Sequence, residues 1–193
     1  MLRAIANSPH DLQPILQTVL DRAVHLCRAE MGSFRLVEEA GLRLVAHKAR
    51  PAASELYSPP ELRGHDTIMG RLVESKSPVQ ISDLATHEEF HPADEADREE
   101  LLSKLGLRTA LYIPMLSDNE LIGVLSIGRG RVEPFTENEI ALVTDFAAQA
   151  AIALEITRRE RELRELQIEL ARANRTDVIA RRRDRLDDLM GDR

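Results

Sequence analysis

The sequence contains little cysteine and few aromatic residues. Its 193 residues include one cysteine, Cys27, and no tryptophan, and aromatic residues make up 3% of the total. A single cysteine excludes an internal disulfide and any paired-thiol motif for a metal or for redox chemistry. So few aromatic rings argue against a stacking platform for single-stranded nucleic acid. We expect Cys27 to be a buried structural thiol, because a reactive thiol needs an electropositive and partly exposed setting.

The chain also lacks long apolar runs and an excess of positive charge. No stretch approaches the roughly 18 consecutive apolar residues of a membrane span, and residues 1–10 carry no apolar signal-peptide region. The formal net charge is -7, and residues 1–157 hold 15 basic against 24 acidic side chains. An acidic surface does not hold phosphate groups, which disfavours nucleic acid and anionic membranes as partners. We therefore expect a cytoplasmic protein that binds neither.

What the sequence does contain is typical of one folded domain with a helical extension. Apolar residues make up 43% and charged residues 31%, and the 193 residues exceed an ordinary domain of about 100 to 150 residues. The spacing of apolar residues predicts helices over 11–30, 67–75 and 93–105, hairpins over 33–48 and 109–128, and a short strand at 79–81. This order predicts an α+β fold in which helices flank an antiparallel sheet.

The last helix is predicted to be long. Thr136 and Glu139 form a capping-box pattern at its start, and no proline or glycine interrupts residues 140–173. Apolar residues recur in it at heptad spacing, which predicts a short coiled coil: Ile152, Ile156, Leu163, Leu166 and Leu170. Arg159 interrupts this seam, and a single charged helix in solvent is the alternative that the pattern leaves open. Beyond Ala173 the seam ends, and we expect residues 174–193 to form a frayed amphipathic helix.

Several stretches of the chain together resemble one known family. They are residues 108–129 (RTALYIPMLSDNELIGVLSIGR), 133–140 (EPFTENEI) and 146–155 (FAAQAAIALE), and the earlier motifs 67–71 (TIMGR) and 78–83 (PVQISD) agree with them. This ordered set is similar to the GAF domains of bacterial sensor kinases and nucleotide cyclases. The resemblance implies a PAS-like fold with an antiparallel sheet of about five to six strands and a long coiled-coil helix at its C-terminal end.

The resemblance also implies a function. GAF domains of this kind sense a small molecule or light, form homodimers through their first and last helices, and pass a conformational change to an output domain or a partner kinase or cyclase, as in two-component systems. Leu16 of the first helix would then join the coiled-coil residues at the dimer interface. We expect an N-terminal extension at 1–10, the GAF domain at 11–157, and a signalling helix with its tail at 158–193. A scaffold that dimerises without binding a ligand is the alternative.

Neither an enzyme nor a particular cofactor is indicated. The sequence has no glycine-rich phosphate loop, nucleophile and base pair, or zinc motif. Residues 130–136 lack the motif of cyclic-nucleotide-binding members, a bilin-attaching member needs a pocket cysteine, and a methionine-sulfoxide-reducing member uses several thiols. Haem or iron would need imidazole, and His65, His87 and His91 are better explained as surface residues of polar segments. The ligand or cofactor stays unidentified.

A pair of hydroxyl groups marks the predicted ligand pocket. Tyr112 and Ser126 alternate with small residues along two buried strands, which leaves room for a molecule that the hydroxyls orient. The other expected pocket residues are Ile68, Met69, Ile81, Asp83, Phe90, Leu102 and Leu105. Ordinary core packing is the alternative for all of them, because a buried tyrosine usually has a hydrogen-bond partner within the protein.

Overall fold

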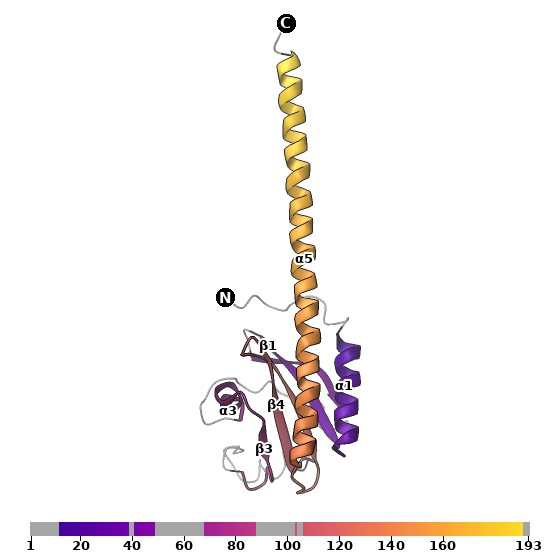
Figure 1. The fold of residues 1–193 in the computed structure, drawn as a ribbon, viewed down its shortest axis with the longest axis vertical. Helices are drawn as coiled ribbons and strands as arrows, with labels where there is room; N and C mark the ends of the chain where they lie inside the picture. Colours follow the sequence, from indigo (N-terminus) through magenta and orange to yellow (C-terminus); the bar gives the residue numbers. More distant parts are fainter. Residues whose placement is uncertain (1–11, 39–40, 49–67, 88–102, 104–105, 191–193) are drawn as a thin grey trace. The chain divides into compact units, whose positions relative to one another are not determined.

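The computed structural model describes residues 12–38, 41–48, 68–87, 103 and 106–190. In chain order its elements are α1 (Gln13–Leu26), β1 (Met31–Glu38), β2 (Gly41–Lys48), α3 (Ile68–Ser75), β3 (Val79–Ile81), β4 (Thr109–Ser117), β5 (Glu120–Arg129) and α5 (Glu137–Met190) (Figure 1). The helix predicted over 93–105 lies outside the described residues except for Ser103. The chain divides into two compact units, Met1–Ala153 and Leu154–Arg193.

One antiparallel sheet of five strands forms the centre of the first unit, in the order β2-β1-β5-β4-β3. Both predicted hairpins are present as neighbouring strands, β1 with β2 and β4 with β5. The second hairpin turns at Asp118 and Asn119, whose φ angles of 49° and 64° are the left-handed values of a two-residue turn. These observations confirm the predicted α+β fold and its antiparallel sheet.

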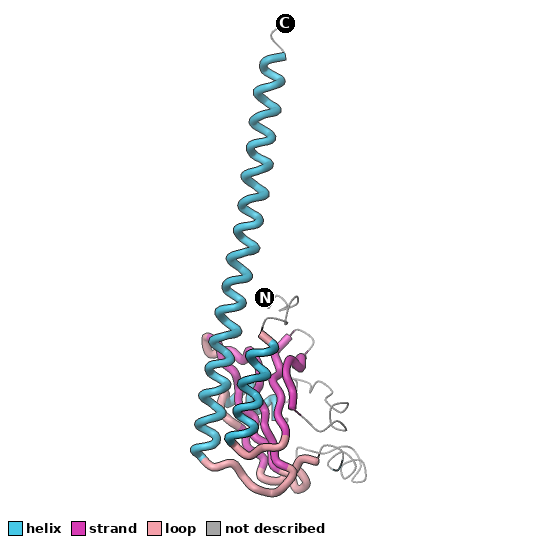
Figure 2. The backbone as a smooth tube through the Cα atoms, turned by 90° about the vertical axis from the view of Figure 1, so that its right-hand side faces the viewer, coloured by secondary structure: helices cyan, strands magenta, loops and turns pink. Residues whose placement is uncertain are grey.

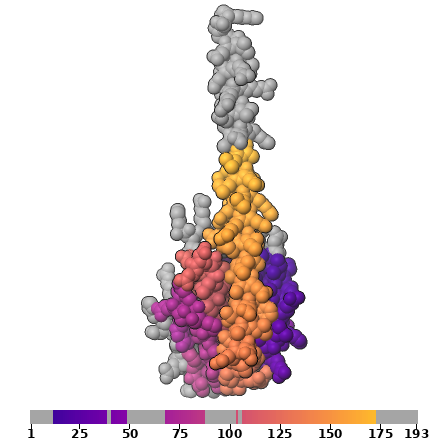
Figure 3. Space-filling model, viewed as in Figure 1, coloured from indigo at the N-terminus to yellow at the C-terminus, as the bar shows by residue number. Residues whose placement is uncertain are grey.

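Different helices cover the two faces of the sheet. α1 and the first turns of α5 lie side by side on one face (Figure 1, Figure 2 and Figure 3). α3 lies on the other face, where Met69 and Leu72 pack on the sheet. Gly32 permits the close approach of α1, since a Cβ there would lie 2.8 Å from Leu20 and 2.9 Å from Val24. On the α3 face, one apolar cluster joins the helix to the sheet: Leu42, Met69, Leu72 and Val124. Apolar packing on both faces stabilises the sheet.

α5 begins at the predicted capping box. The N–H of Thr136 donates to the Glu139 carboxylate at 2.8 Å, and the N–H of Glu139 donates to Thr136 Oγ1 at 3.3 Å. The helix covers 54 residues and continues to Met190, so most of the segment expected as an amphipathic helix after Ala173 is helical. Its continuation agrees with the absence of proline and glycine before Gly191.

One stretch of α5 is apolar enough to resemble a membrane span. An 18-residue window reaches a mean hydropathy of 1.5, and no other helix among the described residues combines that length and composition. The composition has a local explanation, because Val143, Ala147 and Ala150 are at most 1% exposed in the interior of the first unit. Core helices of soluble proteins pass the same test, so the window is weak support for a membrane span.

The second unit contains the remainder of α5. Leu154 at its start is 8% exposed, but five large apolar side chains that follow it within the described residues are more than half exposed in the single chain: Ile156 (53%), Leu163 (60%), Leu166 (55%), Ile168 (52%) and Leu170 (63%). Exposed ion pairs join successive turns, with Arg158 and Glu162 at 3.2 Å and Arg159 and Glu155 at 2.8 Å. Such pairs add only about 0.2–0.5 kcal/mol each to helix stability. This part of α5 therefore carries an exposed apolar surface with modest support from its own charges.

Candidate functional site

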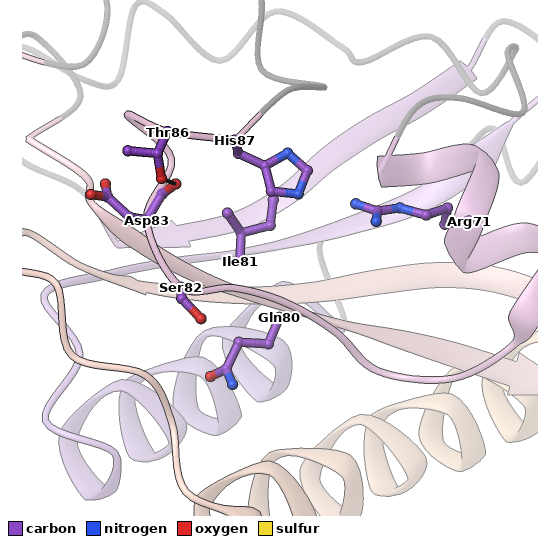
Figure 4. Close-up of a pocket in the computed structure, with 7 residues that line it drawn as sticks. All are labelled: Arg71, Gln80, Ile81, Ser82, Asp83, Thr86 and His87. Carbon is purple, nitrogen blue, oxygen red and sulfur yellow. Dashed lines mark hydrogen bonds between the residues drawn. The ribbon is translucent and has the colours of Figure 1, made fainter.

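A hollow of about 490 Å³ lies beside β3, between α3 and the loop that follows the strand (Figure 4). Its lining residues come from α3, β3 and that loop, and they are Arg71, Gln80, Ile81, Ser82, Asp83, Thr86 and His87. Most of these side chains carry a polar or ionisable group. A hollow of this size and chemistry fits a polar small molecule held by hydrogen bonds.

The lining residues of β3 point to opposite sides of the strand. In Figure 4, Ile81 points toward His87, with Arg71 reaching in from α3, while Gln80 points away from them toward the helices on the other side of the sheet. This alternation follows from the two-residue period of a strand. One short strand therefore contacts both the hollow and the face that α1 and α5 cover.

Asp83 shapes the wall of the hollow through its hydrogen bonds. Its carboxylate accepts two hydrogen bonds from Arg108, Nε to Oδ1 at 2.9 Å and a terminal nitrogen to Oδ2 at 2.7 Å. It also accepts the N–H of Ala85 at 3.0 Å, which fixes the turn after β3. The hydrogen bond and the charge of Asp83 raise the pKa of Arg108. Asp83, which we expected to bind a ligand, thus lines the hollow while its carboxylate is held by Arg108 and by the turn.

The predicted hydroxyl pair sits on the α3 face of the sheet. Tyr112 and Ser126 are direct cross-strand partners in β4 and β5. The Ser126 hydroxyl lies 2.8 Å from the hydroxyl of Ser33, which accepts a hydrogen bond from Arg35 at 2.9 Å. Arg35 is 8% exposed and Ser33 is fully buried. The structure thus adds a buried cation and a third hydroxyl to the pair.

Three of the predicted pocket residues meet in one cluster. Ile81 is 1% exposed and packs with Leu84 and Ala110, and the partly buried Ile68 and Tyr112 pack against them. Met69 lies instead in the cluster between α3 and the sheet, where it is 5% exposed. Phe90, Leu102 and Leu105 lie outside the described residues. Of the predicted set, Ile81 and Asp83 border the hollow itself.

Sequence reasoning did not select four of the residues that define this site: Arg35, Arg71, Gln80 and His87. Arg35 carried a usable signal, because it shares strand parity with Ser33 inside an otherwise apolar strand. The sequence offers His87 only as a haem or iron ligand beside His65 and His91, with a surface position as the preferred interpretation, and the other two histidines lie outside the described residues. Among the residues that the structure describes, no group of three or more ligating side chains could hold a metal ion.

Leu16 does not lie on the surface where we expected it. It is 1% exposed and belongs to the buried face of α1, with Leu20, Ala23 and Val24. Its neighbours Ile15 and Leu26 are the exposed apolar residues of this helix, at 49% and 54%. A helix turns by 100° per residue, so spacing alone does not separate the buried residues of an apolar side from its exposed ones. Ile152 of α5, also predicted for the interface, is 60% exposed in the single chain.

Comparison with known proteins relates the chain to many solved structures. A family model described as the GAF domain matches residues 11–154. No curated protein matches the sequence. The GAF domain region of a protein described as a membrane protein, from Geobacter sulfurreducens, has 26% identity and a TM-score of 0.62, covering 76% of this chain and 94% of its own.

Two further structures are less similar in sequence. A domain of a protein described as a two-component sensor histidine kinase, from Sinorhizobium meliloti, has 17% identity and a TM-score of 0.64, covering 82% of this chain and 99% of its own. A type II free methionine-R-sulfoxide reductase from Thermoplasma acidophilum has 14% identity and a TM-score of 0.58, covering 74% and 92%. These two show a shared fold alone. Because the family model spans most of its length, the chain belongs to the GAF domain family.

Proposed function

We propose that this GAF domain is a sensing module that binds a polar small molecule in the hollow beside β3, forms a homodimer through α5, and passes a conformational change along α5 to an output domain. The observation that carries the proposal is the row of exposed apolar side chains on α5. Ile152, Ile156, Leu163, Leu166 and Leu170 are each 53–63% exposed and recur at heptad spacing. Burying apolar surface yields about 25 cal/mol per Å², which favours pairing with a second copy.

The chemistry of the hollow supports reversible binding of a ligand. Arg71 and His87 supply nitrogen donors, and Ser82 and Thr86 supply hydroxyls. Cys27 is fully buried on the end of α1, and burial, with a further contribution from Glu139, raises its pKa to about 11 against a smaller opposing effect of Arg129. Such a thiol is a poor attachment point for a bilin or any electrophile. We therefore propose that the ligand binds non-covalently. We also propose that the domain has a regulatory rather than a catalytic role and that it is cytoplasmic.

A thermal-shift screen tests the sensing role. A polar metabolite that binds the hollow should raise the melting temperature by about 5 °C at saturation. The variant Thr86→Trp, which fills the hollow from its exposed edge, should lose this shift. Gln13→Trp, an exposed substitution on α1, should keep it.

Two results of the screen would contradict the sensing role. One is the absence of any shift across a broad metabolite library, which would favour the ligand-free scaffold. The other is a shift of equal size in Thr86→Trp and in the parent chain, which would place binding elsewhere.

A further inference from the structure

We infer that Gln80 couples the hollow to the start of α5 through a hydrogen bond to the backbone of Phe135. This inference rests on the proposed sensing function and names the route by which an occupied hollow would act on the helix. Gln80 Oε1 accepts the N–H of Phe135 at 2.6 Å. Phe135 directly precedes Thr136, the first residue of the capping box of α5.

The position of Gln80 suits it to this role. β3 is only three residues long, Val79–Ile81, so a ligand that displaces Ile81 or the following loop also displaces Gln80. Figure 4 shows Gln80 on the side of the strand opposite His87 and Arg71. The strand therefore presents one surface to the hollow and one hydrogen-bond acceptor to the segment before α5. Within the described part of β3, Gln80 both lines the hollow and accepts a hydrogen bond from that segment.

A second connection runs parallel to the first. Ser82, which also lines the hollow, accepts a hydrogen bond from Thr109 Oγ1 at 2.7 Å through its carbonyl oxygen. The same hydroxyl oxygen accepts the N–H of Glu133 at 3.0 Å. Thr109 is fully buried, so both bonds are shielded from water. The segment 131–135 is thus attached to the wall of the hollow at two points.

The far end of this segment is attached to α5 by Arg129. Its guanidinium donates to the carbonyl oxygens of Glu133 at 2.9 Å and Pro134 at 3.2 Å, and to the Glu139 carboxylate at 2.5 Å. Glu139 lies in the first turn of α5. A displacement of Gln80 therefore reaches the helix through a short chain of partly buried hydrogen bonds. A ligand biases the helix to the extent that it prefers one arrangement of these bonds over the other.

A covalent occupant tests this route without knowledge of the natural ligand. In Thr86→Cys, N-ethylmaleimide would attach at the edge of the hollow, while the fully buried Cys27, whose pKa is raised to about 11, stays unmodified. Amide hydrogen exchange of residues 130–140 is then measured by mass spectrometry before and after modification. We expect exchange there to change by roughly threefold or more, since a buried hydrogen bond protects Phe135.

The matched variants differ only in the acceptor at position 80. Gln80→Leu removes the acceptor and should abolish the response to modification. Gln80→Glu keeps an oxygen for the Phe135 N–H and should retain the response. If Gln80→Leu does not fold by circular dichroism, Gln80→Ala takes its place.

An equal response in Gln80→Leu and in the parent would overturn the inference, as would no response in either chain. Both results leave the thermal-shift screen unaffected, because ligand binding in the hollow does not depend on how the signal leaves it. A hit in that screen combined with a negative exchange result would reject the Gln80 route alone. A positive exchange result without any hit would retain the route and reject the sensing of the screened metabolites.

Discussion

At the scale of single residues, Arg129 joins three segments of the first unit. Its side chain is 1% exposed, and beyond its bonds to Glu133 and Glu139 it donates to the carbonyl oxygen of Cys27 at 2.6 Å. The guanidinium carbon lies 4.1 Å from the centre of the Phe135 ring. The end of α1, the end of β5 and the start of α5 therefore meet at one buried cation.

Loss of this cation should destabilise the domain strongly. We expect Arg129→Met to lower the free energy of unfolding by about 3 kcal/mol, because several buried acceptors and a carboxylate lose their donor. Arg131→Met is the matched control: Arg131 pairs with Glu30 and Glu133 but its side chain is 46% exposed, so solvent screens these pairs and the expected loss is much smaller than for Arg129→Met. Urea denaturation measures both. Equal losses in the two variants would contradict the role given to Arg129.

Residues of this kind are the hardest to predict from sequence. Gln80 and Phe135 are 55 positions apart, and the local sequence pattern around either residue does not predict the hydrogen bond between them. Leu16 shows a different limit, because helical spacing identified the apolar side of α1 but not which residues of that side face the sheet. Tyr112 and Ser126 were paired correctly, since strand parity alone brings partners of one hairpin together.

At the scale of elements, the start of α5 depends on Glu139. Burial raises the pKa of its carboxyl, but hydrogen bonds from Thr136 and Arg129, together with the charge of Arg129, outweigh that effect and hold the pKa below the ordinary value. A carboxyl whose pKa is lower in the folded chain than in the unfolded chain stabilises the fold above its unfolded pKa. That stabilisation is lost as the pH falls through the folded value.

The helix start should therefore weaken in acid. Between about pH 5 and pH 3 the melting temperature of the parent chain should fall more steeply than that of Glu139→Gln, which has no carboxyl to protonate. Glu137→Gln, an exposed substitution in the same turn, should keep the slope of the parent. Melting curves across this pH range provide the measurement. Parallel curves for the parent and Glu139→Gln would show that the carboxylate does not stabilise the helix start.

Elements were predictable where their signals are local. The capping box at Thr136 consists of residues close in the sequence and occurs where the sequence placed it, and the hairpin predicted over 109–128 turns at Asp118 and Asn119. The continuation of α5 beyond Ala173 agrees with the absence of glycine and proline before Gly191, although the apolar seam ends at Ala173. The order of the strands in the sheet required the structure, since β1 pairs with β5 across a long separation.

At the scale of the whole molecule, the two units differ in how much of their apolar surface is exposed. The first unit buries most of its large apolar residues on the two faces of one sheet, whereas the described part of the second exposes most of them along one helix. The charges agree with this division, because residues 158–193 hold 11 arginines and 9 acidic residues and the acidic excess lies before them. Near-balanced charges flanking an apolar row suit pairing with a second copy. The account therefore depends on self-association through α5.

Sedimentation velocity on two single variants tests this claim most directly. Leu163→Asp places a charge in the row and should weaken dimerisation by roughly tenfold or more. Ile168→Asp makes the same chemical change at a residue that is 52% exposed but lies off the heptad row, and it should leave the dimer intact. A dimeric parent, a dissociated Leu163→Asp and a dimeric Ile168→Asp are the predicted results. A monomeric parent, or a Leu163→Asp variant as dimeric as the parent, would contradict the account.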